Sequence, residues 1–166
     1  MGENFNTYIT GIAPDFWKDL IIREGELRHY DRGEEFASIG HPAPYLGYVK
    51  SGTLKYAVWA SDGTERVIGL EFAGEFVADF PFSLYGEKSR VSIVAVSECE
   101  IYCLPVDRAK QMLDSDPMAK DIVARSTQAI FSTVYDRYVA LYTLTPQERY
   151  ADIVSRHPDL FTLFPL

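Results

Sequence analysis

Apolar and polar side chains alternate along the chain between Glu26 and Pro105, with a period of two residues. Such alternation predicts β-strands that have one packed face and one solvated face. Short turn sequences rich in Gly, Asp and Ser separate the alternating runs. Many short strands at this spacing are typical of a β-sandwich, a roll or a barrel. The predicted strands are Leu27–Tyr30, Tyr45–Lys50, Thr53–Trp59, Glu65–Phe72, Ser89–Val96 and Cys99–Leu104.

The spacing of apolar residues changes to three and four on both sides of this region, which predicts helices. Asp116 and Pro117 are a suitable N-cap and first-turn proline. The sequence Thr145-Pro146-Gln147-Glu148 has the residues of a capping box and so starts a new helix. The long helix before it therefore ends near Leu144, and Thr143-Leu144 is the predicted hinge. The predicted helices are Pro14–Arg23, Val106–Leu113, Asp116 to about Tyr142, and Pro146–Arg156.

The long helix has an apolar stripe that includes Ile130, Val134 and Leu141. A helix of roughly 25 residues extends about 38 Å, which is longer than a small roll covers. We therefore predict a homodimer that forms through Met118–Leu144, with the two long helices paired along the stripe. The alternative is a helix that packs entirely on its own roll.

The composition suits one globular domain with a substantial core, since the chain has 166 residues, of which 47% are hydrophobic. Its net charge of −8 argues against binding of a nucleic-acid backbone by this chain alone. The first residues lack the basic and apolar regions of a signal peptide, and no run approaches the ~20 apolar residues that span a bilayer. We expect a cytoplasmic protein with no membrane contact.

Neither the cysteines nor the histidines form a recognisable metal site. Cys99 and Cys103 lie on one predicted strand, too far apart for a disulfide and too few for an iron–sulfur cluster. His29, His41 and His157 are scattered without metal-ligand spacing. We therefore predict no metal, no cofactor and no catalytic residue.

The turn at Gly74-Glu75 interrupts a long alternating run and is the main candidate for a binding site. A tight glycine turn can leave backbone N–H groups unpaired, and these could bind a phosphate together with Arg90. Glu75 could accept a hydrogen bond from a ribose hydroxyl. An ordinary hairpin turn with a solvated carboxylate is the alternative.

The order of these elements resembles the Crp/Fnr family of bacterial transcription regulators over nearly the whole chain. The resemblance implies a mainly β fold with flanking helices, a double-stranded β-helix jelly roll followed by a long C-terminal dimerisation helix. It divides the chain into an effector-sensing roll (1–115), the dimerisation helix (116–144), and a hinge with the first helix of a DNA-binding domain (145–166). The family's helix-turn-helix would follow Leu166 and is absent from this chain. The matching segments are Asp31-Arg32-Gly33-Glu34, Val49-Lys50-Ser51-Gly52, Gly74-Glu75, Cys99–Leu104 and the tail from Gln147.

The resemblance also implies an effector site, formed by Gly74, Glu75, Ser89, Arg90, Val134 and Tyr135. Three features of that site depart from the pattern of cAMP-binding members. Val77 replaces a small residue, and Val134-Tyr135 replaces the polar pair that meets the purine. Ser89 stands at the position of the phosphate-binding arginine, so that Arg90 is shifted by one residue and is expected to point to the opposite face of its strand.

From these features we predict the sensing and dimerisation region of a Crp/Fnr-like regulator that does not respond to cAMP. We expect its small-molecule effector to be different or absent, its DNA contact to be made only through the missing helix-turn-helix, and no enzymatic activity. One alternative is a ligand-binding regulatory module of the cyclic-nucleotide type without a DNA role. Another is a cupin-like metalloenzyme, which would need clustered His and Glu ligands.

Overall fold

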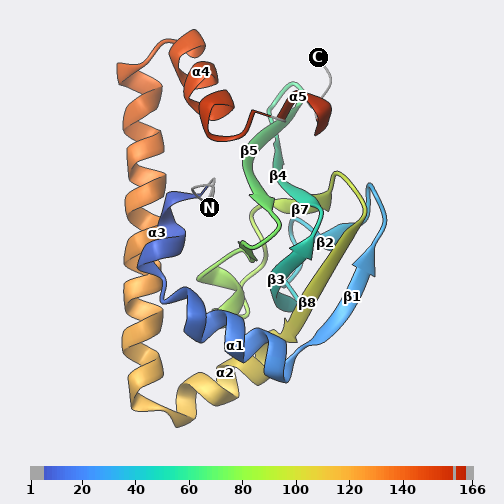
Figure 1. Cartoon of the computed structure of the whole chain (residues 1–166), viewed down its shortest axis with the longest axis vertical. Coiled ribbons are helices and arrows are strands. Elements are labelled where there is room, and N and C mark those ends of the chain that lie inside the picture. The colour runs from blue at the N-terminus through green and yellow to red at the C-terminus, as the bar shows by residue number, and fades with distance from the viewer. Residues whose placement is uncertain (1–5, 159, 164–166) are drawn as a thin grey trace.

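The computed structural model describes residues 6–158 and 160–163, which form a β-roll with one long helix along its side (Figure 1). Eight strands make two antiparallel four-stranded sheets, in the orders β1-β8-β3-β6 and β2-β7-β4-β5. The strands are β1 Glu26–Tyr30, β2 Glu35–Ala37, β3 Tyr45–Ser51, β4 Thr53–Trp59, β5 Glu65–Phe72, β6 Phe76–Val77, β7 Ser92–Ala95 and β8 Cys99–Pro105. The helices are η1 Thr7–Gly11, α1 Pro14–Glu24, η2 Phe82–Tyr85, α2 Val106–Ser115, α3 Pro117–Thr143, α4 Pro146–Arg156 and α5 Leu160–Leu163.

The core of the roll lies between the two sheets and is built from the alternating side chains of the predicted strands. Val49, Ile93 and Ile101 have no exposed surface. Gly47 of β3 opposes both Cys103 and Val77, and a Cβ atom on it would lie 2.6 Å from the Val77 side chain. A glycine here allows β3 and β6 to pair closely, which holds the turn before β6 in place.

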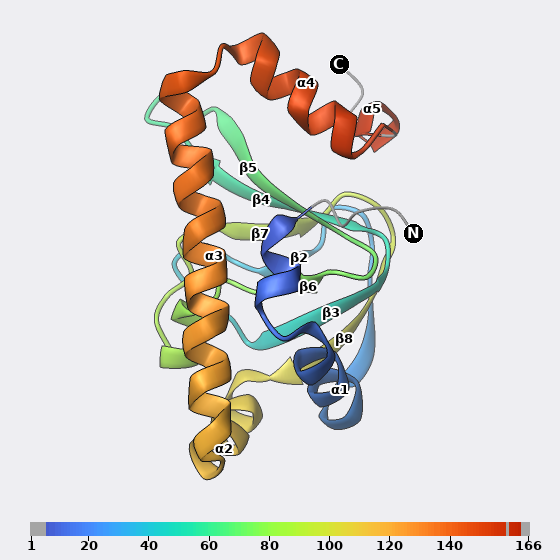
Figure 2. The same cartoon turned by 60° about the vertical axis from the view of Figure 1, so that its left-hand side comes forward.

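Helices α1 and α2 cover one end of the roll, and α3 runs along its side (Figure 1). The short turn η1 lies between α3 and the strands, as both views show (Figure 2). Trp17 of α1 donates a hydrogen bond from Nε1 to Oγ of Ser126 on α3, at 2.9 Å. The Ser126 hydroxyl lies 3.1 Å from the carbonyl oxygen of Ile12. These buried contacts fix the N-terminal segment and α3 relative to each other.

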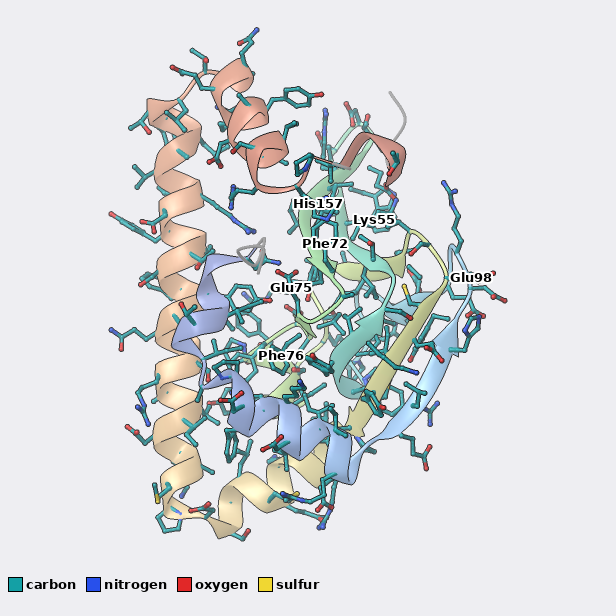
Figure 3. The ribbon with its side chains drawn as sticks, viewed as in Figure 1. Lys55, Phe72, Glu75, Phe76, Glu98 and His157 are labelled. Atoms are coloured by element: carbon teal, nitrogen blue, oxygen red, sulfur yellow. The ribbon has the colours of Figure 1, made fainter. Side chains whose placement is uncertain are left out.

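The last two helices turn back over the tip of β5 (Figure 2). The capping box predicted at Thr145 and Glu148 is confirmed, with both reciprocal hydrogen bonds present. The rings of Phe72 and His157 stack with centroids 3.9 Å apart, and Figure 3 shows the two side chains next to each other. The C-terminal helix pair is therefore packed on the roll.

The predicted fold class is confirmed, and the long helix is present as α3, although its role in dimerisation stays a prediction. Two short strands, β2 and β6, were not expected. The strand expected from Ser89 begins only at Ser92. The N–H of Arg90 instead donates a hydrogen bond to the Asp79 side chain, so it does not pair with a neighbouring strand.

Candidate functional site

A cavity of about 240 Å³ lies between the roll, α3 and the N-terminal segment. Apolar and aromatic side chains make up most of its wall, and three charged residues line it: Glu71, Asp79 and Arg137. The other lining residues are Asn6, Tyr8, Ile12, Trp17, Ile21, Leu46, Gly47, Tyr56, Ile68, Gly69, Leu70, Phe76, Val77, Ala78, Phe80, Val91, Ser126, Ile130, Thr133 and Val134. Such a cavity is the usual form of a small-molecule site.

The Gly74-Glu75 turn lies next to this cavity, and its backbone is fully engaged in the fold. Gly74 has a φ of +91°, which favours glycine. Its N–H donates to the carbonyl oxygen of Val49 at 2.8 Å, and the N–H of Glu75 donates to that of Phe72 at 3.0 Å. The expectation that this turn leaves N–H groups open for a phosphate is therefore wrong for these two groups.

The Glu75 side chain is buried and bonded to the N-terminal segment. The carboxylate accepts hydrogen bonds from the backbone N–H and the side-chain Nδ2 of Asn6, at 3.0 and 2.9 Å. It also accepts from the N–H of Phe72 at 2.9 Å. Figure 3 shows Glu75 close to Phe72 and Phe76, at the end of β5. Three donors from the protein thus already bond to the carboxylate that the sequence suggested as an acceptor for a ribose hydroxyl.

Asn6 is the centre of a buried polar network that joins three parts of the chain. Its Nδ2 also lies 2.8 Å from Oε2 of Glu71 and 2.8 Å from the carbonyl oxygen of Leu70. Its Oδ1 accepts a hydrogen bond from Nη2 of Arg137 on α3, at 2.8 Å. With Asn6 only 2% exposed, the N-terminal segment fills the polar end of the cavity.

Burial raises the pKa of Glu71 well above its ordinary value, and the neighbouring charge of Glu75 raises it further. The Tyr8 hydroxyl donates to Oε1 of Glu71 at 2.7 Å, and this bond opposes part of the increase. Two carboxyl groups that share one donor in a buried space rarely both ionise. The arrangement therefore favours a proton on Glu71.

This shift predicts how stability changes with pH. A carboxyl whose pKa is higher in the folded state than in the unfolded state stabilises the fold below the unfolded value of about 4.5. That contribution is lost as the pH rises through the folded-state pKa, by up to about 1.4 kcal/mol per pH unit. Glu71→Gln imitates the protonated form and should flatten the decline of the unfolding free energy between pH 5 and 8.

Urea unfolding at several pH values measures this decline. Glu98→Gln, which changes an exposed carboxylate in the turn before β8, is the control and should leave the slope unchanged. An unchanged slope for Glu71→Gln would show that Glu71 is ionised in the folded protein.

Ser89 and Arg90 are adjacent in sequence, but Ser89 is buried and Arg90 is exposed. The buried Ser89 hydroxyl is bonded to Asp79 at 3.0 Å and to the carbonyl oxygen of Val91 at 2.7 Å. Arg90 is exposed, and its guanidinium lies over the ring of Phe82, 3.9 Å from the centroid. A carboxylate, that of Asp79, thus occupies the space beside Ser89 where the family resemblance would place a phosphate.

The two residues of α3 predicted for the effector site, Val134 and Tyr135, lie on different sides of the helix. Val134 lines the cavity and is also 56% exposed. Tyr135 faces away from the cavity and stacks on Phe131, with centroids 6.0 Å apart. Of the six residues predicted for the effector site, the structure brings Glu75 and Ser89 to the buried side of the roll and Val134 to the cavity wall.

Sequence reasoning missed Asn6, Glu71, Asp79 and Arg137. Glu71 and Asp79 flank the predicted turn closely enough that their acidic character was a usable signal. Asn6 and Arg137 are separated by 131 residues, and no pattern in a single sequence joins them.

The family model for the cyclic nucleotide-binding domain matches residues 27–116, which are 90 of the 166 residues. The chain therefore belongs to the cyclic nucleotide-binding domain family. The match begins in β1 and ends just before α3, so it covers the whole roll. It confirms the effector-sensing type of roll that the resemblance implied.

Solved structures of regulators share this fold. A proposed cAMP-binding regulatory protein from Silicibacter pomeroyi is 23% identical, with a TM-score of 0.60 over 81% of this chain and 60% of that protein. The catabolite activator protein of Thermus thermophilus is 22% identical, with a TM-score of 0.62 over 82% of this chain and 62% of that one. The c-di-GMP responsive global regulator CLP of Xanthomonas campestris is 20% identical, with a TM-score of 0.62 over 86% and 70%.

At these identities the comparison establishes the fold. The chain spans less than two thirds of the lengths of the first two proteins. No curated protein matches the chain.

None of the helices in the described part of the chain is both long and apolar enough to cross a bilayer. Within residues 6–158 and 160–163, no group of three or more His, Cys, Asp and Glu side chains is arranged to hold a metal ion, which is the kind of cluster that the cupin-like alternative needs.

Proposed function

We propose that this chain is the effector-sensing and dimerisation region of a Crp/Fnr-like transcription regulator that does not respond to cAMP. In this proposal residues 1–115 sense the effector and 116–144 form the dimerisation helix. Residues 145–166 supply a hinge and the first helix of a DNA-binding domain. The proposal assigns no catalytic step to the chain, which acts as a soluble cytoplasmic regulator.

The observation that carries the proposal is an exposed apolar seam on α3. Phe131, Val134, Tyr138 and Leu141 follow one another at intervals of three, four and three residues, and they are 54 to 65% exposed. This is the spacing of the buried positions in a two-stranded coiled coil. Four large apolar side chains in such a row are unfavourable in water and indicate a partner helix. A second copy of α3 supplies the same seam.

The expected lack of response to cAMP is supported by the surroundings of Glu75, Ser89 and Arg90. Asn6 already satisfies the Glu75 carboxylate. Asp79 lies beside Ser89, and the negative charge of its carboxylate would repel a phosphate there. Arg90 is directed to the surface. A cyclic nucleotide would have to displace Asn6 and bring its phosphate close to Asp79, without Arg90 to balance the charge.

The proposed mechanism runs through the link between Asn6 and Arg137. Arg137 belongs to α3, whereas Asn6 is bonded to the carboxyl groups on either side of the Gly74 turn. An effector that enters the cavity would change the packing against Val134 and the position of Arg137. Either change shifts α3 and the hinge at Thr143-Leu144, and so reorients the DNA-binding helices.

The mass of the chain in solution tests the proposal. Light scattering at micromolar concentration should give twice the 18.8 kDa of the single chain, and the mass of a monomer would contradict the proposal.

The chain alone should show no sequence-selective binding to duplex DNA because of its net charge of −8. Selective binding at sub-micromolar concentration would overturn that part.

A second candidate is a ligand-binding regulatory module without a DNA role. It is favoured by the packing of α4 and α5 onto the roll, where Ile153 and Leu160 contact Leu70 and Phe72. In this alternative the last helices close the roll. The sequence that follows Leu166 in the gene distinguishes the two, since a basic helix-turn-helix sequence supports the regulator.

A further inference from the structure

We propose that the cavity beside α3 binds an uncharged, largely apolar molecule with one carbonyl-type hydrogen-bond acceptor, and that Arg137 recognises this acceptor. The inference rests on the proposed function in one respect, namely that the cavity is the effector site. It goes further by naming the chemical class of the ligand and the residue that selects it.

The acceptor groups of the cavity already have donors. Glu71 accepts from Asn6 and Tyr8, and Glu75 accepts from Asn6 and from the N–H of Phe72. Asp79 accepts from the Ser89 hydroxyl and from the N–H of Arg90, both at 3.0 Å. A ligand rich in donors, such as a sugar or an amine, would therefore compete with hydrogen bonds that the fold already makes.

Arg137 is the donor that remains. Its guanidinium has five N–H groups, yet within residues 6–158 and 160–163 it makes one hydrogen bond, to Asn6, and no ion pair. The residue is partly buried and lines the cavity. Its remaining N–H groups can donate to a ligand carbonyl, and hydrogen bonds from a charged donor are stronger than those between neutral groups.

The groups around the cavity disfavour both an anionic and a cationic ligand. The carboxyl groups of Glu75 and Asp79 lie near Arg137, the single cation among the described residues that line the cavity, and Asn6 joins Glu75 to Arg137. An anionic ligand would add a third acidic group beside these two. A cationic ligand would be repelled by Arg137 and would find the carboxylate oxygens occupied.

The remaining wall is apolar, and Trp17, Phe76 and Phe80 supply aromatic surface. The rings of Trp17 and Phe80 are in edge-to-face contact, with centroids 5.9 Å apart. The cavity volume of about 240 Å³ is below the ~300–1,000 Å³ of typical drug-sized ligands. The ligand is therefore a small molecule with an apolar body.

Four probes that share a benzyl group separate the possibilities: methyl phenylacetate is a neutral acceptor, phenylacetate an anion, phenethylamine a cation and propylbenzene a molecule without an acceptor. Trp17 reports binding by fluorescence. The chain has two tryptophans, and Trp59→Phe removes the exposed one. We expect the ester to bind about tenfold more tightly than propylbenzene, as one hydrogen bond to a charged group allows.

Arg137→Met should remove the advantage of the ester over propylbenzene, whereas Arg137→Lys, which keeps a charged donor, should retain the order of the four affinities. Arg125→Met is the matched control, because Arg125 is exposed on the same helix and pairs with Asp121. Equal affinities of the ester and propylbenzene, tighter binding of the acid or the amine, or no binding of any probe would overturn the inference. The proposed function would survive each of these results, since the solution mass tests it separately.

Discussion

Replacing Phe131 and Leu141 of α3 by Glu should convert a homodimer into a folded monomer. Both side chains belong to the exposed seam, at 65% and 59% exposure. Neither lines the cavity, so the substitutions do not remove a contact of the roll. In the dimer they would bury four unpaired carboxylates between two helices, which costs several kcal/mol.

Ile130, next to the seam, should not be changed in this test. Ile130 lies on the stripe predicted from the sequence, but it packs against the core cluster beneath α3 and lines the cavity. A charge at Ile130 would damage the roll whether or not α3 pairs. Light scattering of the Phe131→Glu, Leu141→Glu variant, with circular dichroism to verify its helix content, isolates the dimer contact.

A control with the same change in net charge is the pair Ser132→Glu and Arg125→Gln. Both positions are exposed and lie off the seam on α3. This variant should stay dimeric. If the seam variant keeps the mass of a dimer, the two copies do not meet along α3.

Asn6→Ala should lower the free energy of unfolding by about 2–4 kcal/mol, because it leaves several buried groups without partners. Glu71 and Glu75 each lose a side-chain donor, and Arg137 loses the acceptor that it has among the described residues. The backbone N–H of residue 6 can still reach Glu75, which limits the loss. Urea unfolding near neutral pH measures the change.

Gln128→Ala, which deletes an exposed amide on α3, is the control and should change the unfolding free energy by less than about 0.5 kcal/mol. A similarly small change for Asn6→Ala would mean that the N-terminal segment does not occupy the polar end of the cavity in solution. The site would then be open to a hydroxylated ligand.

The fold could be predicted because its signals are local. The alternation of apolar residues located six of the strands, and Thr145 and Glu148 marked the start of α4 through a motif of four residues. The resemblance to a known family then supplied the arrangement of these elements. The short strands β2 and β6 escaped because two or three residues cannot show a period.

The site could be predicted only in part, because its polar contacts join distant positions. The turn at Gly74 was visible, but the partners of Glu75 were not, since Asn6 is 69 residues away. Arg90 is exposed, but it precedes β7, so the alternation along a strand does not determine its direction. That Asp79 would bond both Ser89 and the N–H of Arg90 depends on the course of the loop after β6, for which the sequence has no signal.

The central claim is that this roll senses something other than cAMP, because Asn6 and Asp79 already bond to Glu75 and Ser89. Isothermal titration calorimetry with cAMP, in the wild-type chain and in Glu75→Ala, tests the claim most directly. We predict no measurable binding to either protein at millimolar nucleotide. A dissociation constant in the low micromolar range or tighter, lost on Glu75→Ala, would show that cAMP displaces Asn6 and would contradict this account.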